Sequence, residues 1–162
     1  METAIILERW LHITAGILWV GLLYFFNLVQ MPAIAAATRD ANGPGPQAIL
    51  KYIVPRALLW FRWASVVTWL AGAALLGPAF TAAFTLQPGF VDIGIGSWLG
   101  TILLFNVWAI IWPNQKKILG MTPATDEQKQ RAKKTVALTA RVNLVLSLPL
   151  IYFMSAQGHG GF

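Results

Sequence analysis

The chain contains no cysteine, only two histidines and few charged residues. Without cysteine there is no disulfide framework, no thiolate metal site, no iron–sulfur cluster and no covalently attached c-type haem, because each of these needs a thiol. Charged residues make up 11% of the 162 residues, whereas soluble domains average about 25%. Hydrophobic residues make up 57%, and we therefore expect a membrane protein.

Four long apolar runs cover about residues 5–33, 58–76, 93–112 and 136–156. Each run is close to the ~20 residues that a helix needs to cross the hydrocarbon core of a bilayer. Continuous runs of this kind favour helices, because a helix satisfies its own backbone hydrogen bonds in lipid. The sequence predicts an all-α fold, in which residues 1–162 form a single integral membrane four-helix bundle in contact with the lipid bilayer.

Lysine and arginine are concentrated in two of the connections between these runs, residues 34–57 and 113–135. The connection 77–92 contains neither residue type. Because loops rich in Lys and Arg stay in the cytoplasm, we expect both basic loops to be cytoplasmic and both termini to lie on the outer, periplasmic side. The chain is then a multi-pass protein of a bacterial inner membrane. Its net charge of +6 reflects this orientation, and we expect no nucleic-acid partner.

The two basic loops differ in their local signals. Residues 38–46 read TRDANGPGP, a turn-rich stretch that breaks any helix, and residues 47–54 are then expected to form a short interfacial helix. In the second loop, Thr125 is a candidate N-cap, so the fourth helix is expected to start near Pro123, well before its apolar run. Its lysines should attract anionic lipid headgroups.

His12 is the main candidate for a functional residue in the first apolar run. Helical spacing places it on one stripe with Gly16 and Trp19, and Gly16 would let a flat ring approach the backbone. A histidine within a membrane helix is costly unless it faces protein, a cavity or a cofactor. One interpretation is an axial ligand of haem b, or a proton or quinone contact. The other is a histidine that bonds a neighbouring helix or is hydrated at the interface.

A haem held by His12 would need its second axial ligand at the same depth. The predicted topology offers Met154 and His159 at the outer end of the fourth helix. The alternatives are core packing for Met154 and a frayed terminus for His159. With two histidines in the chain, at most one haem b per chain is expected, and haem iron is the only metal considered.

A second group of polar residues lies toward the basic side of the predicted bundle. Arginines and amides without a nearby carboxylate would suit an anion or substrate, such as a propionate, a lipid phosphate or a quinone oxygen. The alternative is that each arginine extends its guanidinium to the interface. Pro149 is expected to bend the fourth helix near this group. The predicted pocket residues are Asn27, Arg62, Asn106, Arg141 and Asn143.

Two stretches carry a family resemblance: Phe105–Met121, FNVWAIIWPNQKKILGM, and Arg141–Met154, RVNLVLSLPLIYFM. They resemble the membrane domain of bacterial urate hydroxylases, the cytochrome c-linked urate oxidases, and Trp112–Lys117, WPNQKK, is the most specific part. The first half matches through Trp10–Phe25, WLHITAGILWVGLLYF, which is also similar to the first helix of haem-containing protoporphyrinogen oxidases and of copper-resistance membrane proteins.

The resemblance implies an oxidative membrane protein whose electrons leave through a c-type cytochrome. Urate hydroxylases are longer and include a cytochrome c domain, so this cysteine-free chain resembles a short form without that domain. The positions that match the family motif are Asn106, Trp112, Asn114, Gln115, Arg141, Asn143 and Ser147.

Three functions remain open on the sequence. The first is a membrane redox subunit, an oxidoreductase component with one haem b that needs a separate electron acceptor, such as a c-type cytochrome or another membrane subunit. The second is a cofactor-free structural or accessory subunit of a larger membrane complex. The third, an anion-binding protein or small transporter, ranks last because the sequence shows no inverted repeat and no buried carboxylate for proton coupling.

Overall fold

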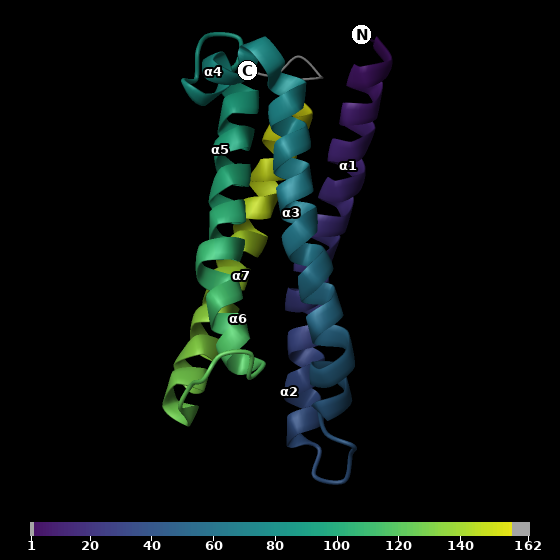
Figure 1. The fold of residues 1–162 in the computed structure, drawn as a ribbon, viewed down its shortest axis with the longest axis vertical. Coiled ribbons are helices and arrows are strands. Elements are labelled where there is room, and N and C mark those ends of the chain that lie inside the picture. The colour runs from purple at the N-terminus through teal and green to yellow at the C-terminus, as the bar shows by residue number, and fades with distance from the viewer. Residues whose placement is uncertain (1, 157–162) are drawn as a thin grey trace.

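The structure, a computed structural model, describes residues 2–156 of the chain (Figure 1). These residues form four helical rods and contain no strand. All four rods are long and apolar enough to cross a membrane, so the chain is a multi-pass membrane protein by this measure. The predicted all-α, four-helix membrane fold is confirmed at this level.

Each rod after the first is linked to the one before by a short connection, and three of the rods are divided into segments. The first rod comprises α1 (Glu2–Tyr24), the π-helical turn η1 (Phe25–Gln30) and α2 (Met31–Arg39), and the second comprises η2 (Ile49–Ile53), α3 (Val54–Leu76), the 3-10 turn η3 (Gly77–Ala79) and α4 (Phe80–Phe84). The third comprises α5 (Val91–Phe105), η4 (Asn106–Ile111) and α6 (Trp112–Ile118), and the fourth is α7 (Asp126–Ala156).

The helices are longer than the apolar runs that predicted them. Helical structure extends into both predicted basic loops, 34–57 and 113–135, because it continues to Arg39 and Ile118 and resumes by Ile49 and Asp126. The expected short helix over residues 47–54 is also not separate, since η2 leads directly into α3. Apolar runs mark the part of a helix that lies in hydrocarbon, whereas the helix itself continues into the interface, where polar side chains are tolerated.

Three of the segment boundaries fall just before a proline. The π-helical turns η1, η2 and η4 are each followed by a helix with proline in its first turn, at Pro32, Pro55 and Pro113. Proline donates no N–H and its ring clashes with the carbonyl four residues earlier, so a widened turn accommodates it. Pro149 differs, because α7 continues through it.

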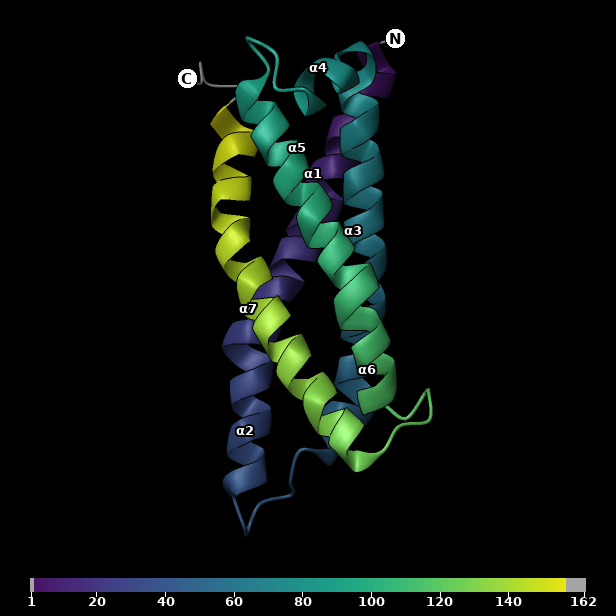
Figure 2. The ribbon, with the colours of Figure 1, turned by 90° about the vertical axis from the view of Figure 1, so that its left-hand side faces the viewer.

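The bundle is built from two pairs of neighbouring rods. Helix α1 packs along α3, and α5 packs along α7, as the two side views show (Figures 1 and 2). The pairs meet through an apolar core with Phe26, Phe61 and Leu103 among its members. The rings of Phe26 and Phe61 meet edge to face with centroids 5.2 Å apart, which joins the first rod to the second.

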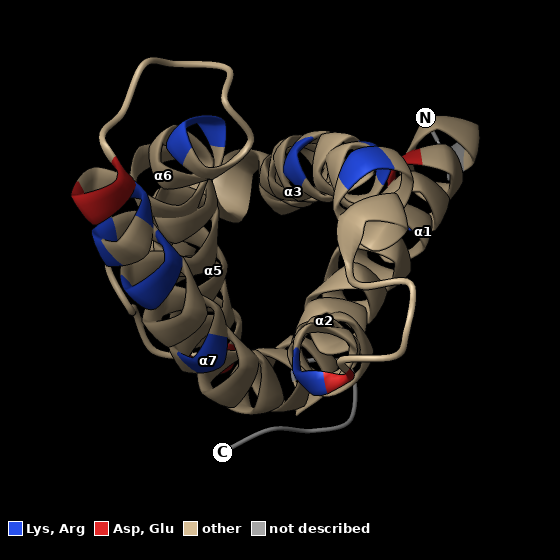
Figure 3. Cartoon of the chain, turned by 90° about the horizontal axis from the view of Figure 1, so that it is seen from below, with Lys and Arg blue, Asp and Glu red and all other residues tan. Residues whose placement is uncertain are grey.

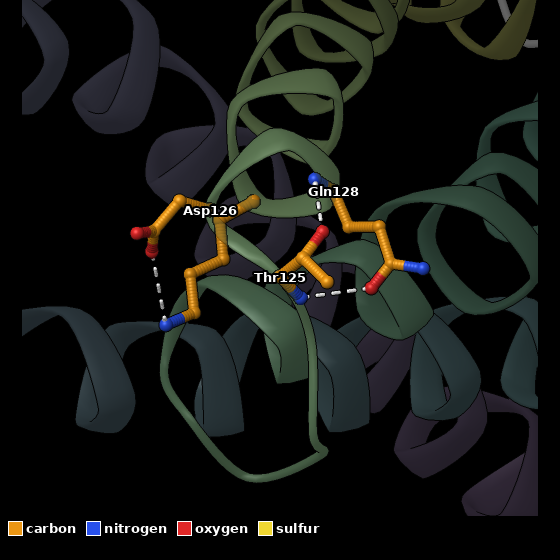
Figure 4. Close-up of polar contacts among 4 residues, drawn as sticks. Thr125, Asp126 and Gln128 are labelled. Atoms are coloured by element: carbon orange, nitrogen blue, oxygen red, sulfur yellow. Dashed lines mark hydrogen bonds and ion pairs between the residues drawn. The ribbon is translucent and has the colours of Figure 1, made fainter.

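Helix α7 begins with the predicted N-cap. The Thr125 hydroxyl accepts a hydrogen bond from the Gln128 backbone N–H at 3.2 Å, and the Gln128 side-chain oxygen accepts one from the Thr125 backbone N–H at 2.9 Å (Figure 4). This reciprocal pair is a capping box, which satisfies two otherwise unpaired backbone donors. The cap fixes the start of α7 well outside its apolar run and so confirms the expectation for Thr125.

The basic residues other than Arg9, which lies near the start of α1, gather toward one end of the bundle. Seen from below, Lys and Arg mark α2, α3, α6 and α7 (Figure 3). Helix α1 begins and α7 ends at the opposite end (Figure 1). Which end faces the cytoplasm is a prediction from the positive-inside rule.

This orientation can be tested with two single-cysteine variants, because the natural chain offers no competing thiol. Gln87 and Gln128 are both exposed, Gln87 between α4 and α5 and Gln128 in the first turn of α7. We expect a membrane-impermeant maleimide added to whole cells to label Gln87→Cys, and to label Gln128→Cys only after the membrane is opened. Labelling of both variants from the same side would contradict the topology.

Candidate functional site

His12 lies on α1 and is bonded to the neighbouring helix α3. Its Nδ1 is 2.8 Å from the backbone oxygen of Thr68, and the residue is half-buried. A carbonyl oxygen only accepts hydrogen bonds, so Nδ1 carries the proton in this contact. In the neutral ring, Nε2 then keeps its lone pair, and it makes no hydrogen bond with the described residues. The histidine is thus held in one tautomer with a free basic nitrogen.

Glycine makes this contact between α1 and α3 possible. A Cβ atom built at Gly72 would lie 2.8 Å from Cε1 and 3.0 Å from Nδ1 of His12, so the imidazole rests directly against the glycine backbone. Gly16 was predicted to admit a flat ring, but it faces Thr68 instead. A Cβ atom built at Gly16 would lie 3.6 Å from Cγ2 of Thr68. Gly72 makes room for the imidazole, and Gly16 lies where α1 and α3 approach each other.

Trp19 adds an unsatisfied donor on the same stripe of α1, two turns further along. Its side chain is 3% exposed and belongs to the core, and its indole Nε1–H has no hydrogen-bond partner among the described residues. Buried polar groups in folded proteins nearly always have a partner, so an orphaned donor points to a water or a ligand that accepts from it. This stripe of α1 therefore presents both a free imidazole nitrogen and a free indole N–H.

Of the two predicted partners of His12, only Met154 lies within the described residues, and it packs against α5. The thioether of Met154 packs against α5, since a Cβ atom at Gly96 would lie 3.4 Å from its sulfur and 3.3 Å from its terminal methyl. It is packed against the apolar core, which agrees with the alternative of core packing. His159 lies outside the described residues. In the described structure, neither predicted partner is shown beside His12.

Two of the predicted pocket residues bond each other between α7 and the third rod. The Asn106 amide donates to the Asn143 side-chain oxygen at 2.7 Å, and the Asn143 amide donates to the backbone oxygen of Leu103 at 3.4 Å. Asn143 is fully buried. These amides act as an interhelical clamp, a use of polar residues that is common in membrane bundles.

Asn27 reaches the same stretch of α7 from η1. Its amide donates to the backbone oxygens of Leu23 at 2.8 Å and Ala140 at 3.3 Å. Further along, the hydroxyl oxygens of Tyr24 and Ser147 lie 3.3 Å apart, within hydrogen-bond distance. These polar contacts join the first rod to α7. The first rod and α7 make few other contacts with each other.

Neither of the two predicted pocket arginines bonds the amides. The guanidinium carbon of Arg62 lies 3.3 Å from the centre of the Trp112 ring and 5.8 Å from that of Trp108, and Arg62 Nε donates to the backbone oxygen of Leu58 at 3.2 Å. This cation–π contact joins α3 to α6 and η4. Arg141 is exposed on α7. No hydrogen bond joins either arginine to Asn27, Asn106 or Asn143, and the anion pocket stays a prediction.

Comparison with known proteins gives no match: no family model, no curated protein and no solved structure resembles this chain closely enough to be reported. Sequence reasoning did not assign Thr68 and Gly72 to the histidine site. The role of Thr68 lies in its backbone oxygen, which no side-chain pattern reveals. Gly72 has no sequence signal of its own, because only the register of α1 against α3 places it beside His12.

Proposed function

We propose that this chain is a membrane redox subunit that binds one haem b through His12 and passes electrons to a separate partner. The observation that carries the proposal is the hydrogen bond from Nδ1 of His12 to the Thr68 backbone oxygen. Metal-ligating histidines almost always donate their other ring nitrogen to a carbonyl or carboxylate, which fixes the tautomer and raises the basicity of the ligating nitrogen. In His12 the nitrogen left for iron is Nε2.

The surroundings of His12 fit such a group. Gly72 presents no side chain beside the imidazole, and the orphaned indole N–H of Trp19 offers a hydrogen bond to an oxygen of a bound molecule. The chemistry that haem b supplies when bound is one-electron transfer between ferrous and ferric iron. The residues of this chain would hold and orient the imidazole through the Thr68 oxygen and the Gly72 backbone.

The resemblance to the membrane domain of urate hydroxylases supports the choice of partner. It favours an oxidoreductase component in a bacterial inner membrane that hands electrons to a c-type cytochrome, either separate or within a larger membrane complex. These 162 residues contain no cysteine to attach a c-type haem, so the proposed acceptor haem lies outside them.

The first test is an oxidised-minus-reduced absorption spectrum of the purified protein, with a pyridine haemochrome assay. We expect b-type bands and about one haem per chain, as a single imidazole ligand implies. A colourless protein after expression with added haem precursor would overturn the redox proposal.

An accessory subunit without a cofactor is the second candidate. It is favoured by the clamp between Asn106 and Asn143, in which the two amides bond each other and join α7 to the third rod. A colourless protein that copurifies in a fixed ratio with other membrane subunits would support this function.

Gly72 provides a prediction that separates the geometry of the site from the mere presence of a histidine. In Gly72→Ala the new methyl group would lie 2.8 Å from Cε1 of His12, so the ring must shift, which disturbs its bond to the Thr68 oxygen. Loss of an outer-shell contact to a metal ligand costs roughly 10–100-fold in affinity, and we expect haem retention to fall accordingly. The measurement is haem per chain after detergent purification, titrated with added haemin.

Gly21→Ala is the matched control for this variant. Gly21 also lies in a membrane helix, on α1, and a Cβ atom there would meet nothing within 4 Å. We expect it to bind haem like the natural chain. Equal haem content in the Gly72 and Gly21 variants would mean that the contact between His12 and α3 does not support the haem.

A further inference from the structure

An open apolar groove of about 350 Å³ lies between the first rod and α7. Tyr24 and Leu28 form one wall, and the other wall is formed by α7. Leu28 is 65% exposed, so no part of the described chain covers the groove. The residues that line α7 here are Leu144, Val145 and Leu148.

Arg141 stands at the end of this groove that is nearer to the basic loops. It precedes Leu144 and Val145 by one helical turn and Leu148 by two, so it lies on the same stripe of α7 as the groove wall. Its side chain is exposed, and among the described residues it makes no hydrogen bond or ion pair. Lys134 continues the stripe two turns closer to the start of α7 and is exposed as well.

This face of α7 thus changes from cationic to apolar along the bundle. A phospholipid of the adjacent leaflet has the matching order, with an anionic phosphate at the interface and an acyl chain that runs toward the centre of the bilayer. An unpaired arginine inside the apolar part of a membrane helix also needs an anion or water, and the lipid phosphate is the anion that the membrane supplies at this depth.

We infer that the groove is a binding site for an anionic phospholipid, whose phosphate contacts Arg141 and whose acyl chain lies between Leu28 and Val145. The Tyr24 hydroxyl, which lies 3.3 Å from the Ser147 hydroxyl, is turned toward α7 and leaves the groove apolar for the chain. The site is independent of the haem proposed at His12, because none of its residues touches that histidine.

The test uses the full chain in vesicles of equal parts phosphatidylcholine and phosphatidylglycerol, followed by native mass spectrometry in mild detergent. We expect the natural chain to retain phosphatidylglycerol in preference to phosphatidylcholine. Because one basic residue near an anionic surface contributes a factor of about five in affinity, Arg141→Gln should lower the retained phosphatidylglycerol about fivefold. Arg141→Lys should keep most of it, since the charge remains.

Two further variants make the result specific. Arg56→Gln removes an exposed arginine of α3 that does not line the groove, and it should retain lipid like the natural chain. Val145→Trp fills the groove at a position that is 64% exposed and so should fold normally, and it should lose the retained lipid.

Three outcomes would overturn the inference. Equal losses in Arg141→Gln and Arg56→Gln would show that only bulk surface charge matters. Full retention by Val145→Trp would place the lipid elsewhere. A dimer in the mass spectrum that Val145→Trp dissociates would assign this face to a second copy of the chain.

Discussion

Replacing His12 with alanine is expected to abolish haem binding while leaving the helices inserted. The variant removes the only imidazole in residues 3–156, and with it the Nε2 atom assigned to iron. We expect haem per chain to fall by more than about tenfold, since even outer-shell changes around a metal ligand cost 10–100-fold. The loss is measured as the amplitude of the reduced-minus-oxidised spectrum relative to protein.

Stability should change little in the same variant. The bond from His12 to the Thr68 oxygen is one interhelical hydrogen bond, and such bonds average about 0.6 kcal/mol in membrane proteins. Helical circular dichroism and the detergent-unfolding midpoint should therefore remain close to those of the natural chain. A variant that loses haem because it has lost its fold would fail this control.

Rescue by free imidazole distinguishes an iron ligand from a residue that only packs against its neighbours. If the lost group was the iron ligand, imidazole added to His12→Ala should occupy the space left by the side chain and restore part of the b-type spectrum. A full haem spectrum in His12→Ala without imidazole would exclude this histidine as an essential ligand, and His159 would then be the remaining histidine to test.

The sequence predicted the number and type of helices well because hydrophobicity alone decides them. Long apolar runs are stable in lipid only as helices, so the four rods follow from composition and length. Helix ends were predicted less well, since they depend on proline-associated turns and on caps outside the hydrocarbon. Thr125 was the exception, because its capping box with Gln128 has a local sequence signature.

The candidate site was predicted by residue type but not by contact. A histidine inside a membrane helix is conspicuous, and the interpretation in which it bonds a neighbouring helix agrees with the Thr68 contact. The orientations of Arg62 and Arg141 could not be predicted, because they depend on which rods are neighbours and in what register. Arg62 lies over Trp112 because α3 meets α6, a pairing that no local pattern in either segment encodes.

Replacing Asn143 with alanine is expected to give a large loss of stability. Asn143 is fully buried, accepts from the Asn106 amide at 2.7 Å and donates to the Leu103 oxygen at 3.4 Å. Alanine removes both bonds and leaves the Asn106 amide without its acceptor. An unsatisfied buried group costs about 1–3 kcal/mol, so we expect the free energy of unfolding to fall by about 2 kcal/mol. The measurement is equilibrium unfolding in mixed micelles.

Asn114→Ala is the matched control, because the Asn114 amide donates only to the Ile110 oxygen one turn earlier in its own rod, at 2.8 Å. Asn114→Ala should lower the free energy of unfolding by less than about 0.5 kcal/mol, as is usual where no buried partner loses its hydrogen bond.

The double variant Asn106→Ala/Asn143→Ala should lose less stability than the sum of the two single changes, because removing both partners leaves neither without a bond. Additive costs would mean that the two amides do not act as a pair. A cost in Asn143→Ala no greater than in Asn114→Ala would mean that the rods are joined by packing alone, and the polar contacts along α7 would then be free to serve a ligand.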